Sequence, residues 1–386
     1  MIKEDRIQKN LKYFSFPRLS GTEYELKAFN RLKQEIKNLN LDFEVQKFAF
    51  SSFYSRLYPK IAFMSASLVV LLLFLNFYMR LSLILILVLL GILVMSFIIT
   101  RKPEKIQFFK KLNSQNLIVK FNQNSNKQGD ISRVALFISH LDSKGQRFKI
   151  SIRIRIIKLW IVTSIFLAFI IPLKTYIFVK FEIIIFIIGL FPLLLNLFAS
   201  VMIIMNTTNN SSEGAVDNAS GIACNLELLN HYSIPENRLL NYNMWFLFTG
   251  AEECGTMGIR HFYNNLENFD PNKSIVFNFE SIAKHVFLFP GGKEGDHIKD
   301  IDYLLLNNSR NLDLNHYITN RVLGTHSDGG FLGDKGVQGY GIGEVEAYNY
   351  MHTPNDTIDK IDTKILQKLC LVLTDALKEH DCNFIK

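Results

Sequence analysis

The chain has 386 residues, of which 48% are hydrophobic and 20% charged, and its formal net charge is +8. This length allows one large domain or two of ordinary size. The Lys and Arg residues gather beside two apolar blocks, and no RNA- or DNA-binding motif accompanies them. The charge therefore favours a lipid bilayer as a partner and argues against nucleic acid.

The polar parts of the chain alternate between helical and strand patterns. Helical spacing predicts helices over residues 23–39, 218–231, 255–265 and 360–378. Apolar runs predict strands over residues 43–50, 116–121, 133–139, 243–248 and 274–279. Alternation of this kind indicates an α/β fold, with helices on the faces of one sheet.

The two apolar blocks cover residues 61–99 and 157–204. Each divides into halves close to the ~20 apolar residues that a membrane-spanning helix needs. Only Met79 and Arg80 separate the halves of the first block. Four core helices of a soluble protein are the alternative, but such helices usually keep a polar face and these have almost none. We therefore predict two transmembrane helical hairpins with four spans.

Each predicted hairpin returns the chain to the side of the membrane that it left. The polar segments 1–57, 101–155 and 206–386 then share one side and form one discontinuous domain, interrupted by hairpins at 58–100 and 156–205. Most of the flanking Lys and Arg residues lie at the ends of the polar segments rather than at the hairpin tips. The positive-inside rule therefore predicts a multi-pass membrane protein with its polar domain in the cytoplasm. Cysteines without a Cys-x-x-Cys pair agree with a reducing compartment.

Acidic and histidine side chains recur at predicted strand ends and helix entries. They are His140 and Asp142 in SHLDSKG, Asp217 in GAVDNASG, Glu252 and Glu253 in FTGAEECGTMG, Glu280 in VFNFES, and His352 in YMHTPNDTID. Zinc binds imidazole nitrogen and carboxylate oxygen. Two histidines and three carboxylates, one of them bridging, are enough for two metal ions about 3.5–4 Å apart. One carboxylate of the Glu252–Glu253 pair then remains, and a carboxylate beside a metal-activated water is suited to be a general base.

Each of these places has an ordinary explanation when it is taken alone. A His-x-Asp pair is commonly structural, a Glu-Glu pair is common on solvated surfaces, and Glu280 follows an apolar run as a strand terminus does. The Asp, Asn, Ser and Thr residues of DNASG and HTPNDT also cap helices well. The occurrence of all of them, in this order and on this alternation of strands and helices, is what favours a metal site.

In this order the residues resemble the co-catalytic di-zinc aminopeptidase family, which includes bacterial leucyl aminopeptidases, glutamate carboxypeptidases and glutaminyl cyclases. The family pattern is a His-x-Asp after a strand, an Asp-Asn-x-x-Gly helix entry, a Glu-Glu pair, a further acid, and a late histidine before a Thr-Pro stretch. The resemblance extends to RLSGTEYELKAFNRLKQEIKNLNLDFEVQKFAF, which is similar to the N-terminal helix and strand. It also extends to HSDGGF (326–331), which is similar to the Ser-Asp stretch near the substrate pocket.

The resemblance implies a zinc-exopeptidase-like mixed sheet flanked by helices, and two zinc ions. It assigns the ligands by position: His140 and Glu280 to one ion, Glu253 and His352 to the other, and Asp217 to both. It also implies that Glu252 is the general base and that Asp142 orients a ligand's imidazole or backbone.

The chain departs from the family pattern in two ways. Glu280 stands where many members have aspartate, although a longer side chain still reaches a metal ion. The hairpins are absent from most members, but a hairpin brings its two ends together and is therefore compatible with insertion into a surface loop.

The function that the resemblance implies is a membrane-anchored zinc aminopeptidase acting on peptides by metal-activated water. The alternatives are a glutaminyl cyclase-like acyltransferase, which needs only one zinc ion, and a non-catalytic receptor or scaffold on the same fold. A transporter is a further alternative, but the four spans carry no charge pairs that would mark a pathway. Glu344 and Glu346 are candidates to meet a substrate's terminal amine, or else solvated loop residues. The oligomeric state, the side-chain preference and the choice between amino- and carboxypeptidase action stay open.

Overall fold

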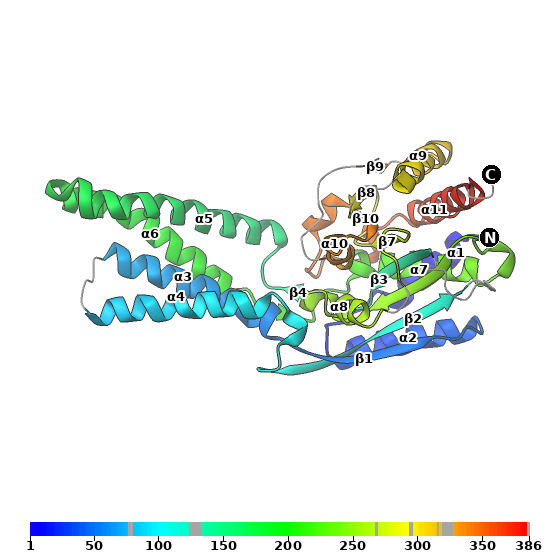
Figure 1. The fold of residues 1–386 in the computed structure, drawn as a ribbon, viewed down its shortest axis with the longest axis horizontal. Coiled ribbons are helices and arrows are strands. Elements are labelled where there is room, and N and C mark those ends of the chain that lie inside the picture. Colours follow the sequence, from blue (N-terminus) through cyan, green and yellow to red (C-terminus); the bar gives the residue numbers. More distant parts are fainter. Residues whose placement is uncertain are drawn as a thin grey trace. The chain divides into compact units, whose positions relative to one another are not determined.

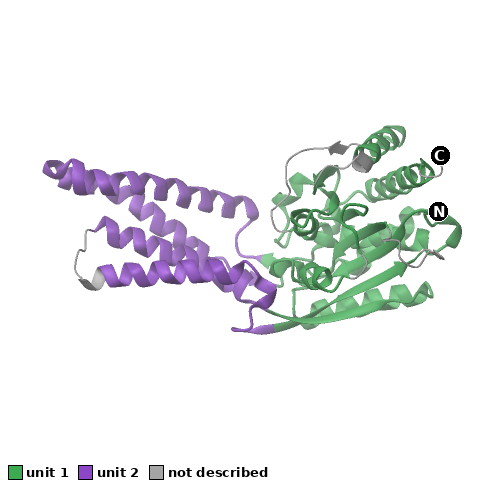
Figure 2. Ribbon diagram, in the orientation of Figure 1, with its two compact units in different colours: residues 1–50, 112–145, 210–386 green, residues 51–111, 146–209 purple. Residues whose placement is uncertain are grey.

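The computed structural model describes residues 1–75, 80–122, 133–266, 269–292, 296–314, 316–318 and 327–383. The chain folds into two compact units, one made of residues 1–50, 112–145 and 210–386, the other of residues 51–111 and 146–209 (Figure 2). The predicted domain limits depend on where a membrane begins, and they stay a prediction. Met79 and His326, which belong to the predicted hairpin tip and the HSDGGF stretch, lie outside the described residues.

A mixed sheet of eight strands forms the centre of the first unit, in the order β1-β2-β6-β3-β7-β10-β8-β9 (Figure 1). The strands are β1 (Glu44–Ser51), β2 (Lys111–Phe121), β3 (Val134–His140), β6 (Asn243–Thr249), β7 (Ile275–Phe279), β8 (Val286–Gly291), β9 (His316–Ile318) and β10 (Gln338–Gly343). Strands β6, β3, β7 and β10 run parallel, whereas β2 is antiparallel to β6 and β8 is antiparallel to β10. A separate two-stranded sheet pairs β4 (Gly145–Gln146) with β5 (Thr208–Asn209).

The five predicted strands are confirmed, and β8, β9 and β10 were not predicted. Strand β10 has the sequence QGYGIG, whose glycines lower its strand propensity. It becomes a strand because it pairs with both β7 and β8. A long-range pairing of this kind leaves no local signal in the sequence.

Helices cover both faces of the sheet (Figure 1). They are α1 (Glu4–Phe14), α2 (Glu23–Asn38), α7 (Ser220–Tyr232), α8 (Met257–Asn264), α9 (Asp296–Asn311), α10 (Asp328–Asp334) and α11 (Thr363–Asn383). Side chains alternate across a strand, so β3 presents Phe137 to a core with α1, α2, α7, α9 and α11. It presents Leu136 and Ile138 to a second core with α8 and α10. Burial on both faces explains the unbroken apolar run of this strand.

The second unit is built from four apolar helices. They are α3 (Tyr58–Phe74), α4 (Arg80–Thr100), α5 (Ile150–Pro172) and α6 (Glu182–Met205). Four stretches in this unit are long and apolar enough to cross a membrane, namely Phe53–Phe74, Leu83–Thr100, Ile150–Ile177 and Val179–Met205. Insertion into a membrane stays a prediction. Helix α5 begins at Ile150, before the apolar block, and includes the basic stretch of IRIRIIK.

The helices of this unit are not purely apolar inside. Asn196 of α6 accepts a hydrogen bond from Ser67 Oγ of α3 at 2.8 Å and donates one to Ser164 Oγ of α5 at 2.8 Å. Trp160 Nε1 also donates to Ser67 Oγ, at 2.8 Å. This buried polar cluster links three of the four helices.

Candidate metal centre

The parallel strands at the centre of the sheet bring the predicted residues to one edge. Strands β3, β6 and β7 run in the same direction, so their carboxyl ends lie together. His140 is the last residue of β3 and pairs with Thr249, the last residue of β6. Glu280 follows β7 directly. Ligands in open α/β sheets bind at this carboxyl edge.

Asp217 reaches the same edge on the kinked turn Ala215–Ala219, in which its own backbone is not helical and which leads into α7. The turn begins at Gly214, whose φ is +60° and whose added Cβ would lie 2.4 Å from Ser143 Cβ. Only glycine is compatible with this position. The Asp356 carboxylate accepts hydrogen bonds from the N–H groups of Val216 at 2.6 Å and Asp217 at 3.4 Å. Asp356, in the HTPNDT stretch, was not predicted to have a role, and it holds the turn that carries Asp217.

The five predicted metal ligands form two triads that share Asp217. In the first, His140 Nε2 lies 3.1 Å from Asp217 Oδ1 and 3.7 Å from Glu280 Oε2. In the second, His352 Nε2 lies 3.2 Å from Asp217 Oδ2 and 2.9 Å from Glu253 Oε1. Within each triad one donor atom from each residue lies within 4.8 Å of the others. Asp217 therefore presents one oxygen to each triad, as a bridging ligand does.

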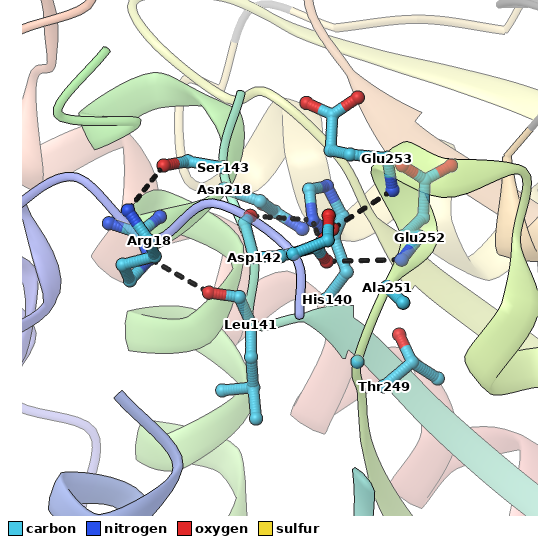
Figure 3. A network of polar contacts seen from close by, with 12 residues as sticks. Arg18, His140, Leu141, Asp142, Ser143, Asn218, Thr249, Ala251, Glu252 and Glu253 are labelled. Atoms are coloured by element: carbon cyan, nitrogen blue, oxygen red, sulfur yellow. Dashed lines mark hydrogen bonds and ion pairs between the residues drawn. The ribbon is translucent and has the colours of Figure 1, made fainter. Parts of the chain in front are cut away.

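Asp142 joins His140 to the Glu252–Glu253 segment (Figure 3). Its carboxylate accepts hydrogen bonds from the N–H groups of Glu252 at 3.1 Å and Glu253 at 3.0 Å. Its backbone carbonyl oxygen lies 3.0 Å from His140 Nδ1. A proton on Nδ1 would be donated to this carbonyl, which leaves Nε2 as a lone-pair donor toward the first triad.

Comparison with known proteins identifies the family. Residues 198–376 match peptidase family M28. The chain carries an M28 peptidase domain. Among solved structures, it is similar to the aminopeptidase from Aneurinibacillus sp. strain AM-1, with a TM-score of 0.58 and 14% identity over 98% of this chain and 94% of that one. The zinc aminopeptidase BSAP from Bacillus subtilis has a TM-score of 0.57 at 13% identity, over 98% and 95% of the two chains.

The glutaminyl cyclase of Fimbriiglobus ruber has a TM-score of 0.53 at 14% identity, over 98% of this chain and 95% of that one. At these identities the likeness shows the fold alone. No curated protein sequence matches the chain. The predicted family and its mixed sheet flanked by helices are confirmed. His140 and Asp142 lie outside the matched residues, and the fold brings them beside the predicted ligands of the matched part of the chain.

The N-terminal segment supports the centre of the M28 domain through Arg18, which the sequence did not single out. Its fully buried guanidinium donates hydrogen bonds to the backbone carbonyl oxygens of Phe14, Phe16, Leu141, Glu213 and Gly214. Burial lowers the pKa of Arg18 to about 10, so it stays charged at neutral pH. One side chain thereby ties the N-terminal segment to the segments that carry Asp142 and Asp217.

Glu25 of α2 supports the Glu252–Glu253 segment in a similar way. Its carboxylate accepts hydrogen bonds from Ala251 N–H at 2.9 Å, Ser114 Oγ at 2.7 Å and Gly21 N–H at 2.6 Å. Burial and the nearby Asp142 charge raise the pKa of Glu25 to about 8. Arg18 and Glu25 both lie in the stretch RLSGTEYE. The sequence indicated that a helix starts there, but it did not indicate the hydrogen-bond partners of these two side chains.

The carboxylates of the centre differ in how firmly they hold a proton. Burial raises the pKa of Glu252 well above its ordinary value, because the neighbouring His140 charge offsets only part of the effect. Burial likewise raises the pKa of Glu280 to about 8. Burial acts in the same direction on Glu253, but the His352 and Lys144 charges outweigh it and lower its pKa to about 2. Of the Glu252–Glu253 pair, Glu252 is the member that belongs to neither triad.

The two glutamates considered for the substrate amine have different surroundings. The buried Glu344 carboxylate accepts hydrogen bonds from the N–H groups of Ala283 at 3.1 Å, Lys284 at 2.6 Å and His285 at 3.0 Å. It therefore caps a backbone turn. Glu346 is exposed. Together with His285 these glutamates form a third group of possible metal donors, in which the backbone occupies Oε2 of Glu344 while Oε1 lies 3.6 Å from His285 Nδ1.

Asp328, in the HSDGGF stretch, is a buried acid beside the same strand edge. Thr249 Oγ1 donates a hydrogen bond to its Oδ2 at 2.5 Å. Its other oxygen, Oδ1, has no hydrogen-bond partner in the described part of the chain. Burial raises the pKa of Asp328 to about 6.

Proposed function

We propose that this protein is a membrane-anchored, zinc-dependent aminopeptidase that hydrolyses N-terminal residues from peptides. The observation that carries the proposal is the pair of triads that share Asp217 at the carboxyl edge of the sheet. The M28 domain supports a hydrolase acting on peptides. The similar zinc aminopeptidase from Bacillus subtilis suggests zinc as the metal.

The donor set meets the requirements of zinc. Each triad offers one imidazole nitrogen and two carboxylates, which are ligand types that zinc prefers. His140 Nε2, Asp217 Oδ1 and Glu253 Oε1 are buried, and among the described residues their nearest polar contacts are those within the triads, with no well-formed hydrogen bond to any other group. Buried polar atoms without partners are unfavourable, so their convergence supports cations between them. We propose one zinc ion for each triad.

When bound, zinc supplies a Lewis acid that polarises the peptide carbonyl and lowers the pKa of water. Glu252 is the proposed general base, which takes a proton from the attacking water and passes it to the leaving amine. Glu252 is buried beside the triads, and burial raises its pKa above the ordinary value, which makes the carboxylate a stronger base. Asp142 positions both Glu252 and His140 through the hydrogen bonds described above. Asp142 thus acts on the reaction through its neighbours.

The charge of the centre favours the amino end of a peptide. Acidic side chains converge here, since Glu253 and Glu280 complete the two triads around the shared Asp217 and Glu252 lies beside them. Arg18 is engaged by backbone carbonyls, and it does not offer a binding group to a substrate carboxylate. A terminal ammonium is therefore the better partner for this surface than a terminal carboxylate. The complete pair of triads favours hydrolysis over a cyclase, which needs only one zinc ion, and over a receptor that has lost its ligands.

The four apolar helices support a membrane anchor by their length and composition. We propose that they span a bilayer as two hairpins and that the M28 domain faces the cytoplasm, as the distribution of basic residues indicates. Peptides and the lipid bilayer are the proposed partners. Reporter fusions at Arg80 and at the C-terminus test this topology, and a C-terminus outside the cytoplasm would contradict it.

The catalytic proposal is tested with the full chain purified in detergent. Metal analysis should find close to two zinc ions per chain, and a panel of aminoacyl fluorogenic substrates should be cleaved. Glu252→Gln should keep the metal and lose hydrolysis by ~100-fold or more, since general-base catalysis contributes about this much. The exposed Glu236→Gln is the matched control and should behave as the wild type. Retained activity in Glu252→Gln would refute the assigned base. Cyclisation of peptides with an N-terminal glutamine, without release of amino acids, would favour the acyltransferase.

A further inference from the structure

A lysine enters the second triad from the segment that follows Asp142. Lys144 Nζ lies 2.6 Å from Glu253 Oε2, and the two side chains are only 15% and 5% exposed. The other oxygen of the same carboxylate, Oε1, lies 2.9 Å from His352 Nε2. Glu253 is therefore shared between an ammonium on one side and the proposed metal position on the other.

Among the described residues, the first triad has no such cation in contact with its carboxylates. The Glu280 carboxylate accepts a hydrogen bond from the neutral amide of Asn278, at 2.9 Å through Oε1. In the part of the chain that the structure describes, no lysine or arginine forms an ion pair with Glu280. The carboxylate that belongs to the second triad alone, Glu253, thus contacts an ammonium, whereas the carboxylate that belongs to the first triad alone, Glu280, contacts a neutral amide.

The two histidines also differ in the contacts of their Nδ1 atoms, which face away from the triads. His140 Nδ1 lies 3.0 Å from the Asp142 carbonyl oxygen and 3.5 Å from its carboxylate. His352 Nδ1 is buried and, among the described residues, has no hydrogen-bond partner. A ligand imidazole that donates its other N–H is fixed in orientation and becomes a stronger donor. Charge and support therefore both make the first triad the stronger metal position.

We propose that Lys144 weakens the metal position of Asp217, Glu253 and His352, so that its occupancy follows the free zinc concentration while the His140 position stays filled. The proposal rests on the proposed function, because it assumes a metal ion at each triad. The ammonium acts in two ways. It repels a dication bound nearby, and it withdraws donor strength from the Glu253 carboxylate that it contacts. Since Lys144 holds Oε2, it leaves Oε1 as the oxygen for the metal.

Zinc titration of the metal-free full chain in detergent, against a chromophoric chelator, tests the proposal without relying on activity. The wild type should bind two ions whose dissociation constants differ by about tenfold or more. Lys144→Met should tighten the weaker site by about tenfold, in the range that contacts behind a ligand typically produce, and should leave the tighter site unchanged. Lys144→Arg keeps the charge and should keep the weak site. Lys47→Met, at an exposed lysine, controls for the loss of one positive charge.

The possible outcomes separate the inference from the proposed function. A tighter second site in Lys144→Met supports the inference, because damage to the fold would weaken binding rather than strengthen it. Two equal sites in the wild type, or a weaker or unchanged second site in Lys144→Met, would overturn the inference and leave the proposed function intact. A wild type that binds no zinc would overturn the proposed function itself. If Lys144→Met does not fold, Lys144→Gln removes the charge with a polar group in place, and the same tightening is expected.

Discussion

Replacement of Asp142 by asparagine is the sharpest test of how the centre is held together. The substitution keeps the shape of the side chain and the backbone carbonyl that faces His140. It changes the carboxylate that accepts hydrogen bonds from Glu252 N–H through Oδ1 and from Glu253 N–H through Oδ2. Asparagine offers one oxygen and one NH₂ group, so one of the two backbone N–H groups would face a donor.

The expected magnitude follows from these contacts. A hydrogen bond to a charged group is worth about 1.5–3 kcal/mol, and one such bond is lost. Ser20 Oγ, which donates to Asp142 Oδ2, is able to turn and accept from the new NH₂ group, which limits the loss to the backbone contact. Because this backbone carries both the proposed base and a proposed ligand, kcat/KM should fall by about 10- to 100-fold, with a similar loss of zinc affinity.

The assay is kcat/KM for an aminoacyl fluorogenic substrate with the full chain in detergent, together with zinc competition against a chelator. Asp300→Asn makes the same chemical change at an exposed position of α9 and should have no effect. If Asp142→Asn retains kcat/KM and zinc affinity within twofold of the wild type, the contacts of the Asp142 carboxylate do not position the centre and the reasoning is refuted.

Three further substitutions test other supports. Arg18→Lys replaces five hydrogen-bond donors by three, so it should destabilise the M28 domain by about 3 kcal/mol or more and lower its melting temperature. An unchanged melting temperature would contradict the role of the hydrogen bonds from Arg18 to the backbone carbonyls. Gly214→Ala should sharply lower zinc affinity, because the φ of this residue is +60° and the new Cβ would lie 2.4 Å from Ser143 Cβ. Gly341→Ala is the control and should be tolerated, because the nearest contact of its new Cβ would be 3.7 Å away. Asn196→Leu should weaken the four-helix unit by about 1–2 kcal/mol in detergent-induced unfolding, and equal stability would show that the polar cluster is dispensable.

The mixed sheet was only partly predictable from the sequence. Strand β3 is buried on both faces and appears as a continuous apolar run, so its end at His140 was located to within one residue. Strand β10 and the short β9 form only because they pair with neighbouring strands, and their local sequence did not predict them. Helix α9 was not predicted either. The apolar hairpins were easy to recognise, because composition over ~20 residues identifies a possible span without any tertiary contact.

The candidate site shows the same division. The five predicted metal ligands lie together in the structure, and they could be proposed from the sequence because zinc chemistry restricts the ligand types, because strand ends place those types at predictable positions, and because their order resembles a known family. Arg18, Glu25 and Asp356 were missed, because nothing in their local sequence indicates what they bond. Glu25 and Ala251, for example, are hydrogen-bonded although they lie 226 positions apart in the chain. Glu344 was considered for substrate binding, but its carboxylate is used by backbone N–H groups.

The sequence by itself determined the types of the candidate ligands, their order along strands and turns, and the two apolar blocks, because each of these is a property of neighbouring residues. The tertiary structure decided that Asp217 presents one oxygen to each histidine, that Asp142 holds the backbone of both glutamates, and that Lys144 contacts Glu253. Such contacts join segments that are distant in the chain. They depend on which strands pair and how loops close over the sheet edge, and local periodicity carries no information about either.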